Sequence, residues 1–159
     1  LDHCHAASET SPDEDTEASH MHQACGRICR CLGEEYVAYL PALLPSLLRS
    51  ANLAPDIKLG DDDDSELEEM ETVQVGDSRV GIKTSVLEEK ATACHMILTY
   101  IHELGPAFFP YLEQVGNVMK PLMTFWYHED VRASAFSAMQ AMCKSAVAYV
   151  NQQQQQPPP

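Results

Sequence analysis

Apolar residues recur every three or four positions along five stretches of the chain, which is the spacing of one face of an α-helix. Gly33 follows the first stretch, where a left-handed helix stop is expected. Prolines within the second and fourth stretches remove backbone donors, so these helices are expected to bend. The first apolar stripe comprises Met21, Ala24, Cys25, Ile28, Cys29 and Leu32. The pattern predicts helices over residues 20–32, 34–51, 86–104, 107–126 and 129–150.

The stretch between the second and third predicted helices has a different pattern. Residues 54–71 carry nine carboxylates and one lysine, a density that cannot form a core and predicts a mobile acidic loop. The residues after it alternate between apolar and polar on both sides of Gly76-Asp77, which predicts a short β-hairpin. The side chains expected to share one face of that hairpin are Val73, Val75, Val80 and Ile82.

An internal repeat organises the rest of the chain. The segments "CLGEEYVAYLPALL" and "ELGPAFFPYLEQVG" superimpose at an offset of 72 residues, so that Leu32-Gly33 matches Leu104-Gly105. A HEAT or armadillo helix pair takes only about 40 residues, and removing the acidic and hairpin segment restores roughly that length. We therefore predict an all-α fold, an α-solenoid of HEAT-type antiparallel helix pairs with about five helices, into which an acidic loop and a small β-hairpin are inserted.

The predicted order of regions follows from these patterns. Residues 1–18 are expected to be a disordered acidic lead, since they carry no helical stripe. Residues 19–150 are expected to be the HEAT-repeat segment, with its insert at residues 54–84. Residues 151–159 are a low-complexity Gln/Pro tail that is not expected to contribute to the fold.

The stretch "HEDVRASAFSAMQAM" fits the second helix of a HEAT repeat. In such a helix a hydrophobic residue followed by Arg stands at the start, and Val131-Arg132 has this form. We expect Val131 to fill the space between the paired helices and Arg132 to reach carbonyl or carboxylate groups of the adjacent turn. The aspartate usual six residues before the Arg is replaced by Trp126, so an Asp–Arg ladder is not expected.

Charge and hydropathy limit the classes of function. The formal net charge of −14 argues against binding to nucleic acids and against binding to anionic membrane surfaces, because both kinds of binding need clustered Lys and Arg. It favours basic protein partners, although an acidic exterior also serves solubility alone. No apolar run approaches the ~20 residues that span a bilayer, and the acidic first residues do not resemble a secretory signal. We therefore expect a reducing compartment, the cytosol or the nucleus.

The cysteine and histidine residues do not predict catalysis. Cys25, Cys29, Cys31, Cys94 and Cys143 fall within helical patterns, where a free thiol behaves as a small apolar residue. Zinc is the alternative, because Cys25 and Cys29 are one helical turn apart and near several histidines, but no C-x2-C pair is present. No nucleophile-elbow, phosphate-loop or dinucleotide-binding motif occurs. We expect no enzyme activity, no metal and no cofactor.

Several segments resemble, in order, the importin beta-3 group of nuclear transport receptors, also called importin five. They are "QACGRICRCLGEEY", "YLPALLPSLLRSANLAPDI", "GIKTSVLEEKATACHMI" and "YHEDVRASAFSAM", and the resemblance covers about residues 22–142. The resemblance implies an excerpt from the middle of a HEAT-repeat superhelix. It also implies basic cargo carrying nuclear localisation signals, and in the whole receptor Ran-GTP and nuclear pore proteins, with shuttling between cytoplasm and nucleus.

Carboxylate and polar residues on helix faces are the candidate cargo contacts, since they can accept charge-assisted hydrogen bonds from Lys or Arg. The acidic run is expected to raise encounter rates with basic proteins. The alternatives are a solvated helix face and a merely disordered loop, and a general HEAT scaffold remains the rival function. Phe125 and Trp126 are expected to pack between repeats or to line a pocket for pore-protein phenylalanines. The candidates are Asp61, Asp62, Asp63, Asp64, Glu66, Glu68, Glu69, Glu88, Glu89, Thr92, Glu103, Glu129, Ser137 and Gln140.

Overall fold

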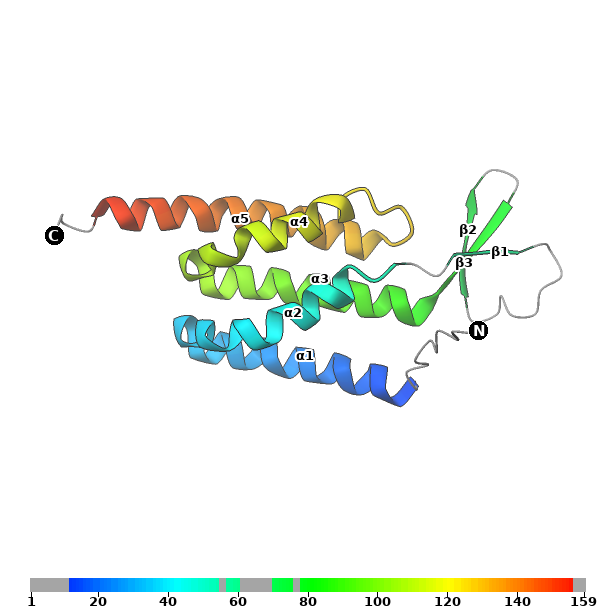
Figure 1. Ribbon diagram of the computed structural model, residues 1–159, viewed down its shortest axis with the longest axis horizontal. Coiled ribbons are helices and arrows are strands. Elements are labelled where there is room, and N and C mark those ends of the chain that lie inside the picture. Colours follow the sequence, from blue (N-terminus) through cyan, green and yellow to red (C-terminus); the bar gives the residue numbers. More distant parts are fainter. Residues whose placement is uncertain (1–11, 55–56, 61–69, 76–77, 156–159) are drawn as a thin grey trace, which may run out of the picture.

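The computed structural model describes residues 12–54, 57–60, 70–75 and 78–155. Within these ranges five α-helices account for most of the chain (Figure 1). Two short 3-10 helices, η1 (Gly33–Tyr39) and η3 (Gly105–Tyr111), lead into the second and fourth of them. The five are α1 (Pro12–Leu32), α2 (Leu40–Ala51), α3 (Thr84–Leu104), α4 (Leu112–Leu122) and α5 (Glu129–Gln155).

The helices form two layers. Helices α1, α3 and α5 run in the same direction side by side, and α2 and α4 run the opposite way over one face of that layer (Figure 1). Helix α3 lies at the centre and contacts α1, α2 and α5. Each antiparallel pair leaves an apolar face that only the neighbouring pair covers, which is the packing of a HEAT-type solenoid. The predicted fold class of stacked helix pairs is confirmed.

The two Leu-Gly corners are built alike. Gly33 and Gly105 have φ of +56° and +49°, the left-handed conformation that glycine adopts without the steric penalty of a side chain. Each glycine ends a long helix and opens a seven-residue 3-10 helix that contains an aromatic buried residue, Tyr36 or Phe108. The internal repeat seen in the sequence is therefore a repeat in three dimensions.

Several helix ends differ from the prediction. Helix α1 begins at Pro12, inside the region predicted to be a disordered lead. Proline suits the first helical position, because the backbone N–H that it lacks would have no hydrogen-bond partner within the helix. Helix α5 continues to Gln155 into the predicted tail, since glutamine has a good helix propensity. Helix α4 ends at Leu122, and residues 123–128 form the turn into α5. Pro121 stands in the last turn of α4, where it limits further extension.

A small antiparallel sheet lies between α2 and α3 in the chain. Strands β2 (Met70–Val75) and β3 (Ser78–Lys83) pair where the sequence predicts a hairpin, with Val73 opposite Val80. Strand β1 (Ile57–Gly60) pairs with the other edge of β3, so the order is β1-β3-β2. Residues 57–60, inside the segment predicted to be a mobile acidic loop, form a strand whose backbone pairs on one side with β3. The acidic run from Asp61 to Glu69 lies outside the described residues.

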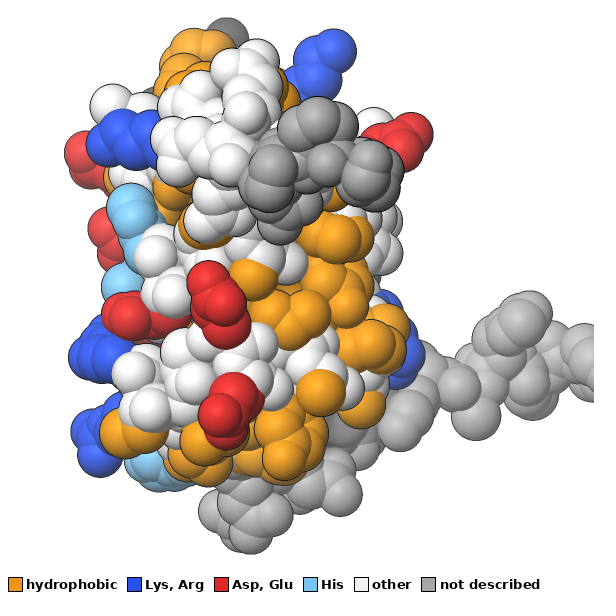
Figure 2. Space-filling view, turned by 90° about the vertical axis from the view of Figure 1, so that its left-hand side faces the viewer, with side chains coloured by type: hydrophobic (Ala, Val, Ile, Leu, Met, Phe, Trp, Pro, Cys, Tyr) orange, Lys and Arg blue, Asp and Glu red, His pale blue; other side chains and the backbone are white. Residues whose placement is uncertain are grey.

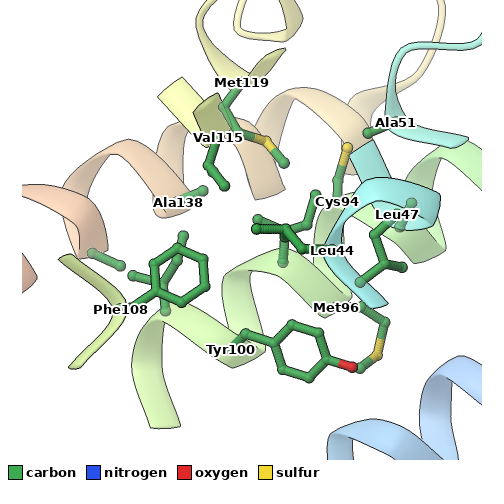
Figure 3. Close-up of a cluster of buried hydrophobic side chains, with 14 of the residues drawn as sticks. Leu44, Leu47, Ala51, Cys94, Met96, Tyr100, Phe108, Val115, Met119 and Ala138 are labelled. Atoms are coloured by element: carbon green, nitrogen blue, oxygen red, sulfur yellow. The ribbon is translucent and has the colours of Figure 1, made fainter. Parts of the chain in front are cut away.

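One apolar cluster connects all five helices. Its members come from both layers and include Leu44, Cys94, Tyr100, Phe108 and Ala138, several of which face one another in Figure 3. The predicted stripe of α1 is only partly right, since Cys29 is fully buried whereas Met21 and Ile28 are 60% and 50% exposed. Helix α1 lies at the edge of its layer, where its main contacts within the described residues are with α3 and η1.

Candidate functional site

The predicted cargo-contact residues fall into three groups: exposed residues, half-buried residues and residues outside the described part of the chain. Those on α3 and α5 that are exposed are Glu88, Glu129, Ser137 and Gln140. Those that are half-buried, all on α3, are Glu89, Thr92 and Glu103. The remaining seven lie outside the described residues: Asp61, Asp62, Asp63, Asp64, Glu66, Glu68 and Glu69.

Carboxylates gather where α3 and α5 begin, and we call this group the acidic end. It consists of Glu88 and Glu89 on α3 and Glu129 and Asp130 in the first turn of α5. The two helices pack side by side and start at the same end of the molecule (Figure 1). Glu129 and Asp130 are favourable there because the helix dipole places partial positive charge in the first turn of α5, whereas Glu88 and Glu89 follow the first turn of α3. Among side chains that the structure describes, none of the four forms an ion pair.

Glu103 is placed differently from the other candidates. It lies at the far end of α3, and its Oε1 accepts a hydrogen bond of 2.9 Å from Nε of Arg30 on α1. The two side chains are 30% and 64% exposed, so the pair contributes at most about 1 kcal/mol. Figure 2 views the end of the molecule where Glu103 lies, and basic, acidic and histidine side chains alternate along its left-hand side. Glu103 is therefore paired with a cation, unlike the four carboxylates of the acidic end among the described side chains.

A buried lysine ties the helices together behind the acidic end. Lys90 is 2% exposed, its ammonium donates a hydrogen bond to the carbonyl of Ala51 at the end of α2, and its Nζ lies 5.2 Å from the Phe125 ring centroid. Burial lowers the pKa of Lys90, against which Cys94 and Glu89 act in the opposite direction. Lys90 thus connects the start of α3 to the end of α2 and to the α4–α5 turn. Sequence reasoning missed Lys90, because lysine is nearly always exposed.

The α4–α5 turn is held from both sides. Arg132 donates from Nη1 to the carbonyls of Phe125 and Trp126 at 3.2 and 3.4 Å, and Val131 is fully buried. Both roles predicted for the Val-Arg pair are confirmed. Phe125 and Tyr127 also pack on Leu87 at the start of α3.

Trp126 does not pack between the helices. Its side chain is 80% exposed, whereas Phe125 beside it is half-buried. The prediction that Trp126 packs between repeats is therefore wrong within the described residues. Phe125 and Tyr127, on either side of Trp126, are half-buried and pack on Leu87, whereas Trp126 does not.

The buried thiols and phenols lie in the apolar core. Burial raises the pKa of Cys29 and of Cys94 to about 11, so both are thiols rather than nucleophilic thiolates at neutral pH. The hydroxyls of Tyr36 and Tyr100 are 3.1 Å apart, and burial raises the pKa of each, that of Tyr100 to about 12. Among the residues whose side chains are described, no group of three or more His, Cys, Asp or Glu could hold a metal ion. No helix among these residues combines the length and apolar character of a membrane span.

The chain is similar in sequence to importin beta-3 receptors. "Importin subunit beta-3" of Saccharomyces cerevisiae is 28% identical over 149 residues, which cover 91% of this chain and 14% of that protein. "Probable importin-5 homolog" of Dictyostelium discoideum is 26% identical over 136 residues, which cover 86% of this chain and 12% of that protein. The chain therefore spans only a small part of these relatives. No protein-family model matches it.

Solved structures of Kap121p have the same fold. Kap121p bound to Nup53p superimposes with a TM-score of 0.77 and 28% identity, over 87% of this chain and 14% of that one. Kap121p bound to RanGTP superimposes with a TM-score of 0.75 and 27% identity, over 92% of this chain and 15% of that one. The resemblance to the importin beta-3 group is confirmed in sequence and in structure.

Proposed function

We propose that the chain is a cargo-binding segment of a nuclear import receptor and that its acidic end binds basic segments of cargo proteins. Homology to importin beta-3 receptors over about nine tenths of the chain is the observation that carries the proposal. Relatives with this fold bind other proteins, since Kap121p structures contain Nup53p, Ste12p or Pho4p. In this proposal the chain has no catalytic role.

The charge distribution supports basic cargo. The net charge of −14 attracts basic proteins at long range, and the acidic end adds four carboxylates without ion pairs among the described side chains. Carboxylates of this kind accept short, charge-assisted hydrogen bonds from Lys and Arg. A basic peptide crossing the starts of α3 and α5 would meet Glu88 from one helix and Glu129 from the other.

We further propose that residues 54–84 are an insertion within one HEAT pair, between α2 and α3. The equivalent connection between α4 and α5 takes only residues 123–128, so the difference in length is the strands and the acidic run. Within the acidic run, Asp61–Asp64 then attract basic cargo at long range and raise its association rate. In the whole receptor we expect binding to Ran-GTP and to nuclear pore proteins, and shuttling between cytoplasm and nucleus.

Titration of the chain with a Lys-rich nuclear-localisation peptide, followed by calorimetry at low and high salt, tests the proposal. We expect saturable binding that weakens as salt rises, because screening acts on exposed charges. The double variant Glu129→Gln/Asp130→Asn should bind several-fold more weakly. Its matched control is Glu34→Gln/Glu35→Gln, which removes the same charge from exposed positions of η1 at the other end.

The outcomes separate cargo binding from the general HEAT scaffold. If both double variants weaken binding equally, net charge rather than the acidic end is responsible. If the chain binds neutral or acidic segments and ignores the basic peptide, the scaffold is the better reading. Replacement of Asp61–Asp64 by Asn should slow association more than it changes dissociation in stopped-flow measurements. Unchanged association rates would refute the proposal that these residues attract basic cargo.

A further inference from the structure

Trp126 is the most exposed large apolar side chain at the acidic end. Its side chain is 80% exposed, and it precedes Glu129 by only three residues. Tryptophan on a protein surface leaves a large apolar area in water, and such residues are concentrated at the centres of binding sites. Within the described part of the chain Trp126 has neither a ring contact nor a cation contact. Its ring faces are therefore free to bind a partner.

The backbone that carries Trp126 is fixed. Arg132 donates to the carbonyl of Trp126 at 3.4 Å and to that of Phe125 at 3.2 Å. On either side of Trp126, the rings of Phe125 and Tyr127 pack on Leu87, with 5.4 Å between the two ring centroids. A turn anchored at three successive residues loses little conformational entropy when the exposed ring binds a ligand.

The charges around the indole select a cation. Glu129 and Asp130 follow it in the chain, and the Cα atoms of Trp126 and Glu129 lie at most about 11 Å apart. Helix α3 contributes Glu88, which follows the residue on which the turn packs. Of the cations on the described helices next to the turn, Lys90 and Arg132 donate to backbone carbonyls and Lys120, in the last turn of α4, is exposed, so the four carboxylates of the acidic end outnumber three cations. An anion would meet net negative charge here, whereas an ammonium or guanidinium group would meet carboxylates and an aromatic face.

The turn already contains one aromatic–cation contact of this kind. The ammonium of Lys90 lies 5.2 Å from the Phe125 ring centroid on the buried side of the turn. Trp126 offers the outer side a ring whose attraction for cations exceeds that of phenylalanine. We propose that Trp126, together with Glu129 and Asp130, forms a pocket for one Lys or Arg side chain of a bound basic segment. This inference rests on the proposed function and names the residue that anchors the cargo.

Trp126 is the only tryptophan of the chain, so its fluorescence reports on this pocket alone. The experiment titrates the 159-residue chain with a peptide of Lys, Gly and Ser, which has no aromatic residue, and records emission and affinity. We expect a saturable change in emission at the same peptide concentrations as binding measured by calorimetry. In the free chain, quenching of Trp126 relative to free tryptophan should be raised for caesium ions and lowered for iodide, since the neighbouring carboxylates attract cations and repel anions.

Three variants test the nature of the contact. Trp126→Leu keeps an apolar side chain but removes the ring, and should weaken peptide binding by about 3- to 30-fold. Trp126→Phe keeps a weaker aromatic face and should retain a larger part of the affinity than Trp126→Leu. Because Trp126 is 80% exposed, both variants should fold, which circular dichroism checks. Glu129→Gln/Asp130→Asn should reduce the difference between caesium and iodide quenching.

The possible results separate this inference from the proposed function. If the wild-type chain binds the peptide while emission and the affinity of Trp126→Leu are unchanged, basic segments bind elsewhere and only the pocket is refuted. If Trp126→Leu binds as well as Trp126→Phe, the contact is apolar and the cation pocket is refuted. If the wild-type chain does not bind the peptide at all, both the pocket and the proposed basic-cargo function are refuted.

Discussion

Replacing the buried lysine by methionine tests what holds the acidic end together. Lys90→Met keeps an unbranched side chain of similar length, so the apolar stem continues to fill its place. It removes the donor to the carbonyl of Ala51 and the charge beside Phe125. The side chain is 2% exposed, so water cannot replace the lost donor.

The expected effect is the difference between two opposing terms. A buried carbonyl that loses a charged donor costs about 1–3 kcal/mol, and the contact with the Phe125 ring adds about 0.5–2 kcal/mol. Removing the charge also removes its desolvation penalty, which the lowered pKa of Lys90 reveals. We expect Lys90→Met to lower the free energy of unfolding by about 1–2 kcal/mol near neutral pH.

Urea unfolding followed by circular dichroism measures this difference. The control is Lys120→Met, which changes an exposed lysine of α4 and should leave the free energy of unfolding within about 0.5 kcal/mol. A Lys90→Met variant as stable as the wild type, or more stable, would refute the reasoning, because desolvation would then outweigh the bond to Ala51.

The pH dependence gives a second check on the same residue. The pKa of Lys90 is lowered in the folded chain, so the unfolded chain binds more protons between that pKa and the ordinary value of about 10.4. The wild type should therefore gain stability relative to Lys90→Met as pH rises through this window. A difference that stays constant up to pH ~10 would show that burial does not penalise the charge.

Three further predictions concern the corners, the core thiols and the ends of the stack. Gly105→Ala should lower the free energy of unfolding by about 1–2 kcal/mol, because φ is +49° there; no loss in urea unfolding would contradict the left-handed corner. The pKa of the Cys94 thiol is raised to about 11 by burial, so stability should fall between pH ~9 and 11, and less steeply in Cys94→Ala. Equal slopes would contradict a buried thiol. The isolated chain should self-associate through exposed Phe136 and Val147, and Phe136→Ser should shift sedimentation toward the monomer, whereas a wild-type monomer at all concentrations would contradict this.

Local signals predicted the helices and corners of the fold. The stop at Gly33 and the apolar stripes of α2 and α4 are set by residues close in sequence, so periodicity and glycine position were sufficient. The stripe of α1 was too wide, because periodicity does not say how many sides of a helix find a neighbour. Met21 and Ile28 have the spacing of core residues and lie at the edge of the layer.

The acidic end was only partly predictable. Glu88, Glu89 and Glu129 were identified from their position off the buried stripes, but nothing in the sequence separates them from Glu103. That separation depends on Arg30, which precedes Glu103 by 73 residues and reaches it only because α1 packs on α3. The sequence predicts that Trp126 packs between repeats or lines a pocket, and its 80% exposure follows only from the structure, in which its two neighbours pack on Leu87.

Each helix pair has a basic side chain that donates to a backbone carbonyl at the end of the pair's first helix or in the turn after it, but only one of these two residues could be predicted from the sequence. In the α4–α5 pair, Arg132 donates to the carbonyls of Phe125 and Trp126 in the turn after α4. In the α2–α3 pair, Lys90 donates to the carbonyl of Ala51 at the end of α2. Arg132 was predictable because it follows a buried valine and lies seven residues from its acceptor. Lys90 lies 39 residues from its acceptor across the strands, so its role follows only from a structure in which α2 and α3 are paired.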